Sequence, residues 1–143
     1  MMSGCEVTGG SRSLGDEEFV NVVPPEQFLQ KYVFFTDPSY GTTTLALTRL
    51  KTGGVFKDVT IECLGTVTGW TPVGTSGEAE VAAVDLVRNG AGRGTCKNGS
   101  QSAQSEGRFG ITVWGLDAYA SYAYPAGGNA APINAVVVVP APK

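Results

Sequence analysis

The chain contains no histidine, and this absence removes more chemistry than any other feature of its composition. Without an imidazole group there is no Ser-His-Asp or Cys-His catalysis, no histidine-ligated metal and no imidazole switch near neutral pH. Basic residues are few and scattered, ten against 13 acidic residues, so no clustered positive potential faces a phosphate backbone. We therefore expect neither a histidine-dependent enzyme nor a nucleic-acid-binding protein.

Long apolar runs and long helices are also missing. The longest apolar run, residues 135–139, is far shorter than the roughly 18 residues of a membrane-spanning helix. Twenty glycines and eight prolines interrupt helices, while 42% apolar and 16% charged residues favour a packed core over disorder. The length of 143 residues fits one core. We predict a flexible N-terminal tail over residues 1–18 and a single domain over residues 19–143.

Alternating apolar and polar residues predict β-strands, most clearly where Val59, Ile61 and Cys63 face one side of the chain. Residues 89–107 contain few apolar side chains and are expected to be the longest irregular stretch. About eight or nine short antiparallel strands predict an all-β fold, either a two-sheet β-sandwich or a jelly-roll-like barrel. The main strand candidates are residues 19–23, 31–36, 43–50, 59–63, 78–88, 109–113, 119–124 and 132–139.

Two of the three cysteines are candidates for a disulfide. Cys63 and Cys96 lie 33 residues apart, and a bridge closing that loop would stabilise the fold by roughly 3–4 kcal/mol in the chain-entropy model. Cys63 faces the core side of its strand, and Cys96 would anchor the long irregular stretch. We predict that they are bonded; the alternative is two reduced cysteines, as in a cytosolic protein.

The third cysteine, Cys5, follows Met2, Ser3 and Gly4. A small-small-Cys triplet after an apolar residue is typical of the end of a bacterial lipoprotein signal, where the thiol receives a lipid. No charged segment and no apolar segment precede it in the chain, as a signal peptide would require. Lipidation, an unattached tail cysteine and an intermolecular disulfide remain open for Cys5.

Four aromatic residues cluster late in the chain: Trp114, Tyr119, Tyr122 and Tyr124. On a strand, such residues can form an aromatic strip that stacks on a sugar or fills a pocket of a protein partner. The alternative is structural, because aromatic residues in β-proteins commonly cap or fill the core. We favour the structural role and keep the four residues as the candidate binding face.

Acidic residues suggest weaker alternatives. Two carboxylates could in principle hydrolyse a glycosidic bond, but no fixed pair stands out, so solvated surface acids are favoured. The triplet of Asn98, Gly99 and Ser100 is a glycosylation sequon at a predicted exposed turn. Calcium takes oxygen ligands from dispersed loops, but the chain lacks a D-x-D-x-D-G loop, and we expect neither a metal nor a cofactor. The acids considered for calcium are Asp37, Asp58, Glu62, Asp85 and Asp117.

Three segments resemble the N-terminal domain family of IgG-Fc-binding protein: residues 32–40, 56–63 and above all 109–127. The last has the family's pattern V-x-G-x-D-x-Y-x-S-Y-x-Y-P-x-G, followed by a hydrophobic strand, here residues 133–139. The resemblance runs from about residue 19 to 139. It implies an extracellular, non-catalytic β-domain concerned with adhesion or matrix contact, and the start at Cys5 favours a bacterial member.

Two functions follow as hypotheses. The first is an extracellular binding or adhesion module on a cell surface or in a secreted protein, with a protein or glycan ligand on the face of residues 114–128. The second is a structural subunit that assembles with copies of itself through strand edges or the apolar closing strand. Membrane contact is expected only through a lipid on Cys5.

Overall fold

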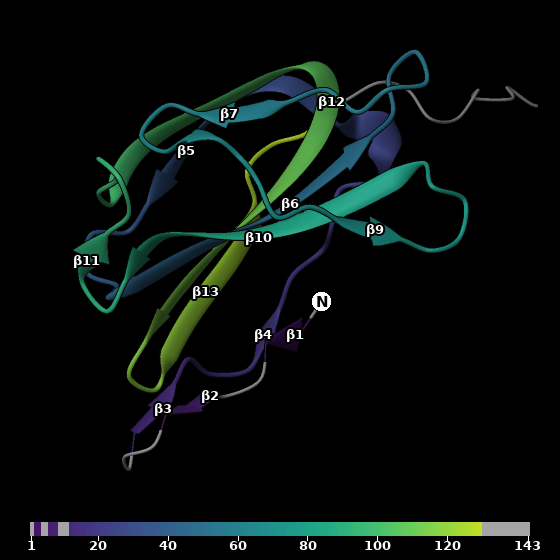
Figure 1. Ribbon diagram of the computed structural model, residues 1–143. Helices are drawn as coiled ribbons and strands as arrows, with labels where there is room; N and C mark the ends of the chain where they lie inside the picture. The colour runs from purple at the N-terminus through teal and green to yellow at the C-terminus, as the bar shows by residue number, and fades with distance from the viewer. Residues whose placement is uncertain (1, 4–5, 9–11, 130–143) are drawn as a thin grey trace, which may run out of the picture.

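The computed structural model describes residues 2–3, 6–8 and 12–129, and these residues form an all-β, antiparallel fold (Figure 1). A short ladder pairs β1 (Met2–Ser3) with β4 (Glu18–Phe19), and another pairs β2 (Glu6–Thr8) with β3 (Arg12–Leu14). A 3-10 turn, η1, spans Pro25–Gln27. One sheet of nine strands contains β5 (Leu29–Thr36), β6 (Thr42–Leu50), β7 (Val59–Ile61), β8 (Gly65–Thr66), β9 (Thr71–Val73), β10 (Ala79–Arg88), β11 (Ala91–Gly92), β12 (Gly99–Asp117) and β13 (Ala120–Pro125).

The sheet curls because the long strand β12 belongs to both of its parts. The first half of β12, residues 99–105, pairs with β5 and β7, and the second half, residues 109–117, pairs with β6 and β13. Between these halves the register with β5 shifts, because Gln104 pairs with Lys31 but Phe109 with Leu29. Such an irregularity bends a strand. The expected two-sheet sandwich is therefore corrected to one strongly curled sheet, a half-barrel, because one strand continues through both layers.

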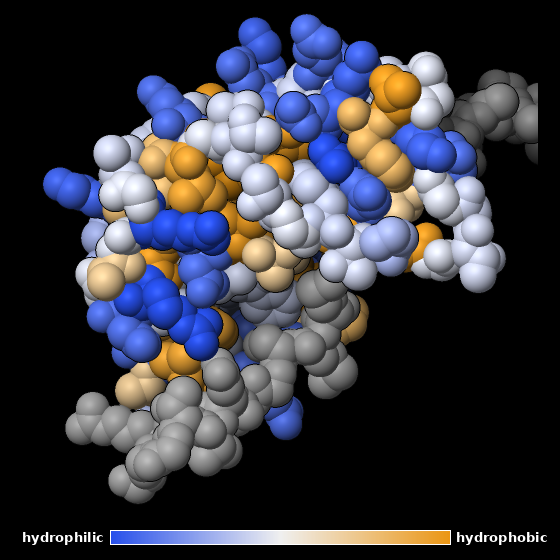
Figure 2. Space-filling model, in the orientation of Figure 1, coloured by the Kyte–Doolittle hydropathy of each residue, from blue (hydrophilic) through white to orange (hydrophobic). Residues whose placement is uncertain are grey.

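The core lies inside the curl. Phe109, Leu45 and Ile61 are fully enclosed there, contributed by β12, β6 and β7. The segment after β7 packs against this core through the partly buried Leu64 and Trp70. Figure 2 shows apolar side chains gathered between β7 and β10, with hydrophilic side chains around them. The curled sheet thus buries one continuous apolar interior, as a single domain requires.

A second apolar layer covers the outer face of the second half of β12. Side chains alternate along a strand, so Trp114 and Gly110 face away from the core that Val113 enters. Phe28 lies on Gly110, and Val20, Phe28 and Trp114 are all buried. Among residues 12–129, none forms such a cover over the outer face of the first half, where Val33 and Phe35 on the neighbouring β5 are 77% and 57% exposed.

Most strand predictions are confirmed, with β5, β6, β7, β10 and β13 falling on predicted segments. The prediction of irregular structure over residues 89–107 is wrong from Gly99 onward, where the longest strand begins. Residues 20–23, predicted as part of a strand, run over the sheet without a strand assignment. The predicted closing strand, residues 132–139, lies outside the described residues.

The segment before Phe19 contacts the domain. Leu14 forms a β-bridge with Ala118, and the Gly15 N–H donates to the Asp117 carbonyl at 2.7 Å. The Asp16 N–H donates to the Ser121 hydroxyl at 3.1 Å. The part of the chain that contacts the sheet therefore begins at least as early as Leu14, and the division at residue 18 stays a prediction.

Candidate binding site

The four aromatic residues of the predicted binding face do not share one face. Tyr122 and Tyr124 lie opposite Gly115 and Val113 across the β12–β13 ladder and pack against the core. Trp114 lies on the other side of the sheet and is only 7% exposed. The structure brings the two tyrosines together, stacked with 6.2 Å between ring centroids, and separates them from Trp114.

Tyr122 and Tyr124 close the gap between β13 and β5 with their hydroxyl groups. The Tyr122 hydroxyl accepts a hydrogen bond from the Asp37 N–H at 3.0 Å. The Tyr124 hydroxyl accepts from the Phe35 N–H at 3.2 Å and donates to the Phe35 carbonyl. Burial raises the pKa of both phenols above the ordinary value. These contacts make both tyrosines supports of the half-barrel.

Tyr122 also explains a glycine of the late motif. A Cβ at Gly115 would lie 2.0 Å from the Tyr122 ring, so the ring covers the glycine directly across the ladder. The Tyr40 ring meets the same Tyr122 ring edge-on, with centroids 4.8 Å apart. The spacing of glycine and tyrosine in the motif is therefore a packing requirement.

Tyr119 is the exposed member of the four. It stands in the turn between β12 and β13 and is 62% exposed. Its φ of +56° is left-handed, a conformation that is unfavourable for a residue with a side chain. Strained residues that persist on a surface are concentrated at functional sites. Of the four residues of the predicted face, Tyr119 is thus the most exposed to solvent.

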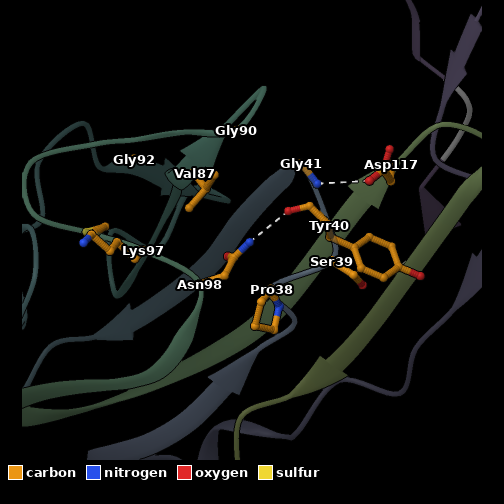
Figure 3. Close-up of a pocket in the computed structure, with 11 residues that line it drawn as sticks. Pro38, Ser39, Tyr40, Gly41, Val87, Gly90, Gly92, Lys97, Asn98 and Asp117 are labelled. Carbon is orange, nitrogen blue, oxygen red and sulfur yellow. Dashed lines mark hydrogen bonds between the residues drawn. The ribbon is translucent and has the colours of Figure 1, made fainter.

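A pocket of about 350 Å³ opens at the same end of the sheet (Figure 3). Three segments build it: the β5–β6 turn, the connection from β10 to β12, and the end of β12 at Asp117. Glycines form part of its wall, and at Gly92 a Cβ would lie 2.0 Å from the Cys96 carbonyl oxygen. The lining residues are Pro38, Ser39, Tyr40, Gly41, Val87, Gly90, Gly92, Cys96, Lys97, Asn98 and Asp117.

Hydrogen bonds hold the three segments of the pocket to one another (Figure 3). The Asp117 carboxylate accepts from the Gly41 N–H at 3.2 Å, and the Asn98 side-chain amide donates to the Tyr40 carbonyl at 2.8 Å. The Gly90 N–H donates to the Gly41 carbonyl at 2.7 Å. The exposed Lys97 ammonium makes no ion pair within the described ranges 2–3, 6–8 and 12–129. Lys97 and Asp117 thus both line the pocket, on a frame that these hydrogen bonds fix.

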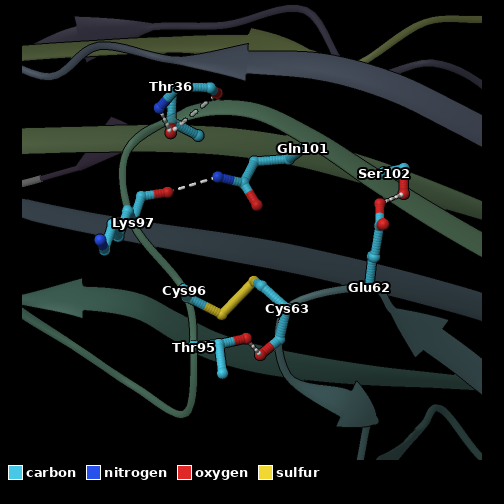
Figure 4. The surroundings of a disulfide bond; sticks show 9 residues. Thr36, Glu62, Cys63, Thr95, Cys96, Lys97, Gln101 and Ser102 are labelled. Carbon is cyan, nitrogen blue, oxygen red and sulfur yellow. Dashed lines mark hydrogen bonds between the residues drawn. A yellow bond between two sulfur atoms is a disulfide. The ribbon is translucent and has the colours of Figure 1, made fainter.

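The predicted disulfide between Cys63 and Cys96 is confirmed (Figure 4). It ties the segment after β7 to the connection before β12, with 4.7 Å between the Cα atoms. The Thr95 hydroxyl donates to the Cys63 carbonyl at 2.9 Å beside it. Because Cys96 also lines the pocket, the bridge fixes the pocket wall as well as the sheet. Such a bond is typical of an extracellular or secreted setting.

The acids considered for calcium are not brought together. Within the part of the chain that the structure describes, no three Cys, Asp or Glu side chains are placed to hold a metal ion. The acids instead serve local contacts: Ser39 with Asp37, Arg49 with Asp58, Ser102 with Glu62, Thr44 with Asp85, and the Gly41 N–H with Asp117. Their dispersal follows from their positions on separate strands and turns.

The sequon prediction is wrong in its structural premise. The Asn98 side chain is not free in an exposed turn, because its oxygen accepts from the Thr43 hydroxyl at 2.7 Å. Its nitrogen, the atom to which a glycan is attached, donates to the Tyr40 carbonyl. Glycosylation would replace one of the two hydrogens on this nitrogen and place a sugar beside the bond to Tyr40.

Cys5 lies outside the described residues. In the part of the chain that the structure describes, no helix is long and apolar enough to cross a bilayer.

Comparison with known families decides the classification. A family model described as IgGFc binding protein matches residues 1–115. The chain belongs to this family. The residues of this chain that match the IgGFc binding protein family include Cys63, Cys96, Trp114 and most of the residues that line the pocket. The match ends before Asp117. Its match begins and ends earlier than the expected span of 19–139. Neither a curated protein nor a solved structure matches the chain.

Sequence reasoning missed most of the pocket. It predicted irregular structure over residues 89–107 and a break between the strands 31–36 and 43–50, but no local pattern showed that these two parts of the chain meet. Their contact depends on the pairing of β5 and β6 with β12. That strand begins at Gly99, far along the chain from the end of β6 at Leu50. Lys97, Asn98 and Tyr40 were therefore not recognised as neighbours.

Proposed function

We propose that this IgGFc binding protein family domain is a non-catalytic extracellular module that binds a protein or glycan ligand at the pocket end of the half-barrel. The observation that carries the proposal is the bonding of three loops into one frame by Asp117, Asn98 and Gly90. Binding residues are commonly presented on loops that a rigid sheet positions. A frame fixed before binding loses little entropy when the ligand arrives.

The chemistry of this end suits recognition by hydrogen bonds and one aromatic contact. The pocket is lined by one basic residue, Lys97, and one acidic residue, Asp117. Tyr119 stands two residues beyond Asp117 and exposes its ring. Tyrosine is enriched at contact sites because it combines a large apolar surface with a polar hydroxyl. Both protein surfaces and glycans carry hydrogen-bonding groups and apolar patches that can contact these residues.

The disulfide supports an extracellular location on a cell surface or in a secreted protein. Within that setting we propose an adhesion role and, from the resemblance, a bacterial protein. Lipid attachment through Cys5 would then hold the module at a membrane. Mass spectrometry of the protein from its native membrane fraction tests this part, because a diacylglyceryl group adds a defined mass to the Cys5 peptide.

A second candidate is a self-assembling structural subunit. The observation in its favour is the uncovered outer face beside the first half of β12, where Val33 and Phe35 are exposed. Large exposed apolar side chains in one place mark interaction surfaces. Sedimentation of the full chain over a wide concentration range separates the two functions, because a binding module remains a monomer at all concentrations and a subunit associates.

Arrays of glycans and matrix proteins probed with the full chain test the binding function directly. We expect hits that weaken at least tenfold in Lys97→Ala and Tyr119→Ala, which each remove about 1.4 kcal/mol or more of contact energy. Lys51→Ala is the matched control, because Lys51 is far from Asp117 in the sheet and pairs with Glu78. Hits that are equally strong in all three variants would remove the pocket end from the proposal.

A further inference from the structure

We propose that the outer edge of β5 accepts an extended, acidic polypeptide segment of a partner protein as an additional strand. The inference concerns a different surface from the pocket and does not depend on it. It rests on the backbone groups of β5 that face away from β12, on the two tyrosines that cover part of that edge, and on the unpaired charge of Lys31.

The backbone of β5 shows which of its groups face outward. In an antiparallel ladder, alternate residues direct their N–H and C=O toward one neighbour and then away from it. Both backbone groups of Phe35 bond to the Tyr124 hydroxyl and therefore face away from β12. The register with β12 is continuous from Thr36 to Lys31, so the backbone groups of Val33 and Lys31 face the same way as those of Phe35.

Some of the backbone N–H and C=O groups of β5 that face away from β12 are hydrogen-bonded to tyrosine hydroxyls, and others have no such partner in the described part of the chain. The Tyr124 hydroxyl covers Phe35, and the Tyr122 hydroxyl covers the Asp37 N–H. Among the residues described, no group bonds to the outward N–H and C=O of Val33 or Lys31. An unpaired strand edge is a template for another strand, and natural proteins commonly cover such edges. Two residues of the β5 edge are therefore left open beside a covered stretch.

The side chains next to this open edge add apolar contact. Val33 is 77% exposed and Phe35 is 57% exposed, and both lie on the outer face of the sheet. In strand addition, main-chain bonds supply affinity and alternate side chains supply specificity. An added strand would place every second side chain beside Val33 and Phe35 on this face.

Charge decides between a foreign segment and a second copy of the chain. Lys31 is exposed and has no ion pair in the described part of the protein. If two β5 edges paired about Tyr32, Lys31 of each copy would lie diagonally across from Lys31 of the other, and like charges in such positions are unfavourable. A partner strand with a glutamate or aspartate facing Lys31 gains energy where a second copy loses it. The geometry therefore favours an acidic foreign segment.

The probe is a synthetic ten-residue peptide in which valine or threonine alternates with glutamate, titrated into the full chain with its disulfide intact. We expect binding, with the largest amide chemical-shift changes at Lys31 and Val33. Two matched peptides should bind at least about tenfold more weakly, because they lose the charge pair or main-chain bonds. One replaces glutamate with lysine, and the other carries N-methyl groups on alternate amides. Equal binding by all three peptides, or no binding at millimolar concentration, would overturn the proposal.

Variants of the protein separate the edge from the neighbouring face. Val33→Pro removes only an outward N–H, because that group makes no bond to β12, and proline is tolerated at strand edges. We expect a loss of at least about tenfold in peptide affinity, whereas Val33→Thr, which keeps the N–H, stays within threefold. Equal losses in both variants would assign the contact to the side chain and refute strand addition.

Two further results test the cover and the choice of partner. Tyr124→Phe uncovers Phe35, so the peptide should bind several-fold more tightly, with new shifts at Phe35. Lys31→Glu should reverse the preference to the lysine peptide. Concentration-dependent dimers of the peptide-free chain that Val33→Pro abolishes would show that a second copy occupies the edge, and the proposal of a foreign segment would then be wrong.

Discussion

Every residue from Phe109 to Gly115 in the second half of β12 is buried, whereas buried and solvent-facing residues alternate along the first half from Gln101 to Gln104. Both halves belong to the same strand and both line the same core. They differ in what lies on the outer face: Phe28 covers Gly110 in the second half, whereas no residue that the structure describes covers Val33 and Phe35 beside the first half. The sequence of a strand between two apolar layers is a continuous run of apolar residues. The sequence of a strand with one solvent-exposed face alternates between apolar and polar residues.

The two halves are also stabilised differently. The second half is held by contacts on both faces, with Phe28 on Gly110 outside and the core inside. The first half has one apolar face. It is also held by the disulfide, which joins the segment after β7, at Cys63, to the segment before β12, at Cys96. Packing thus supports one half, and a covalent link supports the other. The exposed half is free to present Val33, Phe35 and the β5 edge.

The largest effect is expected from removing the ring that fills the covered side. Trp114→Ala should lower the free energy of unfolding by about 3–5 kcal/mol, because the side chain is buried and a cavity would remain. Phe35→Ala, the matched change beside the uncovered half, should cost less than about 0.5 kcal/mol. Urea unfolding measures both. Similar losses in the two variants would show that the faces are equally packed.

Removing the disulfide should mainly destabilise the first half of β12, residues 99–105. The double change Cys63→Ala and Cys96→Ala should cost roughly 3–4 kcal/mol, because it frees a loop with a sequence separation of 33 residues. Amide hydrogen exchange should show greater loss of protection at Ser102–Gln104 than at Ile111–Val113. The parent protein under the same oxidising conditions is the control. A uniform loss of protection would mean that the bridge supports both halves alike.

The close contact between Phe28 and Gly110 gives a third test of the covered face. Gly110→Ala should cost about 1–3 kcal/mol, because the new Cβ would lie 2.4 Å from Cε1 of Phe28. Ser102→Ala on the uncovered half should stay within about 0.5 kcal/mol. Adding Phe28→Ala should remove most of the extra cost of Gly110→Ala in a double-mutant cycle. An additive cycle would contradict the contact.

The comparison also shows which parts of the fold are readable from sequence. Phe109 to Val113 was identified because its apolar residues repeat. Residues 99–105 are rich in serine and glutamine, and their strand forms because β5 and β7 supply backbone partners from distant parts of the chain. The sandwich prediction failed at the same place, since no local signal shows that one strand passes through both layers. The disulfide was readable because Cys63 lies in the clearest alternating segment.

For the candidate site, the sequence singled out the segment of residues 114–124 but not how each of its side chains is used in the fold. Glycine and tyrosine recur in residues 115–124, and the structure uses Tyr122 to cover Gly115 and bond Asp37. Which aromatic ring is exposed depends on the hairpin register, which puts only Tyr119 in the turn. The pocket could not be found, because its walls come from three loops that pairing of distant strands brings together.

The turn that carries Tyr119 should tolerate change better than either half of β12. Tyr119→Ala should be nearly neutral for folding, because the ring is 62% exposed. Tyr119→Gly should gain up to about 1 kcal/mol, because glycine adopts a φ of +56° without the strain that a side chain brings. Thermal melts compare the variants with the parent. A large loss in either would mean that the ring is needed for packing.

The smallest effect is confined to high pH and concerns the tyrosines that join β13 to β5. Burial raises the pKa of Tyr122 and Tyr124 above the ordinary value of 10.0, so the folded state favours the neutral phenols. Their contribution to stability is complete below pH 10 and is lost as the pH rises through the raised values. The free energy of unfolding, measured from pH 8 to 11, should show this decline. In the double variant Tyr122→Phe with Tyr124→Phe, the free energy of unfolding should fall less steeply with pH. An unchanged slope would assign the titration elsewhere.

The passage of β12 through both layers also sets the order in which the protein can fold. Strands β5, β6 and β7 each take β12 as a neighbour, yet β12 is synthesised after all three. Pairings between distant segments are slow to form, and edges without partners are prone to aggregate while they wait. The earlier strands therefore remain incomplete until synthesis reaches Asp117, and a chaperone that shields them during that interval would raise the yield of folded protein.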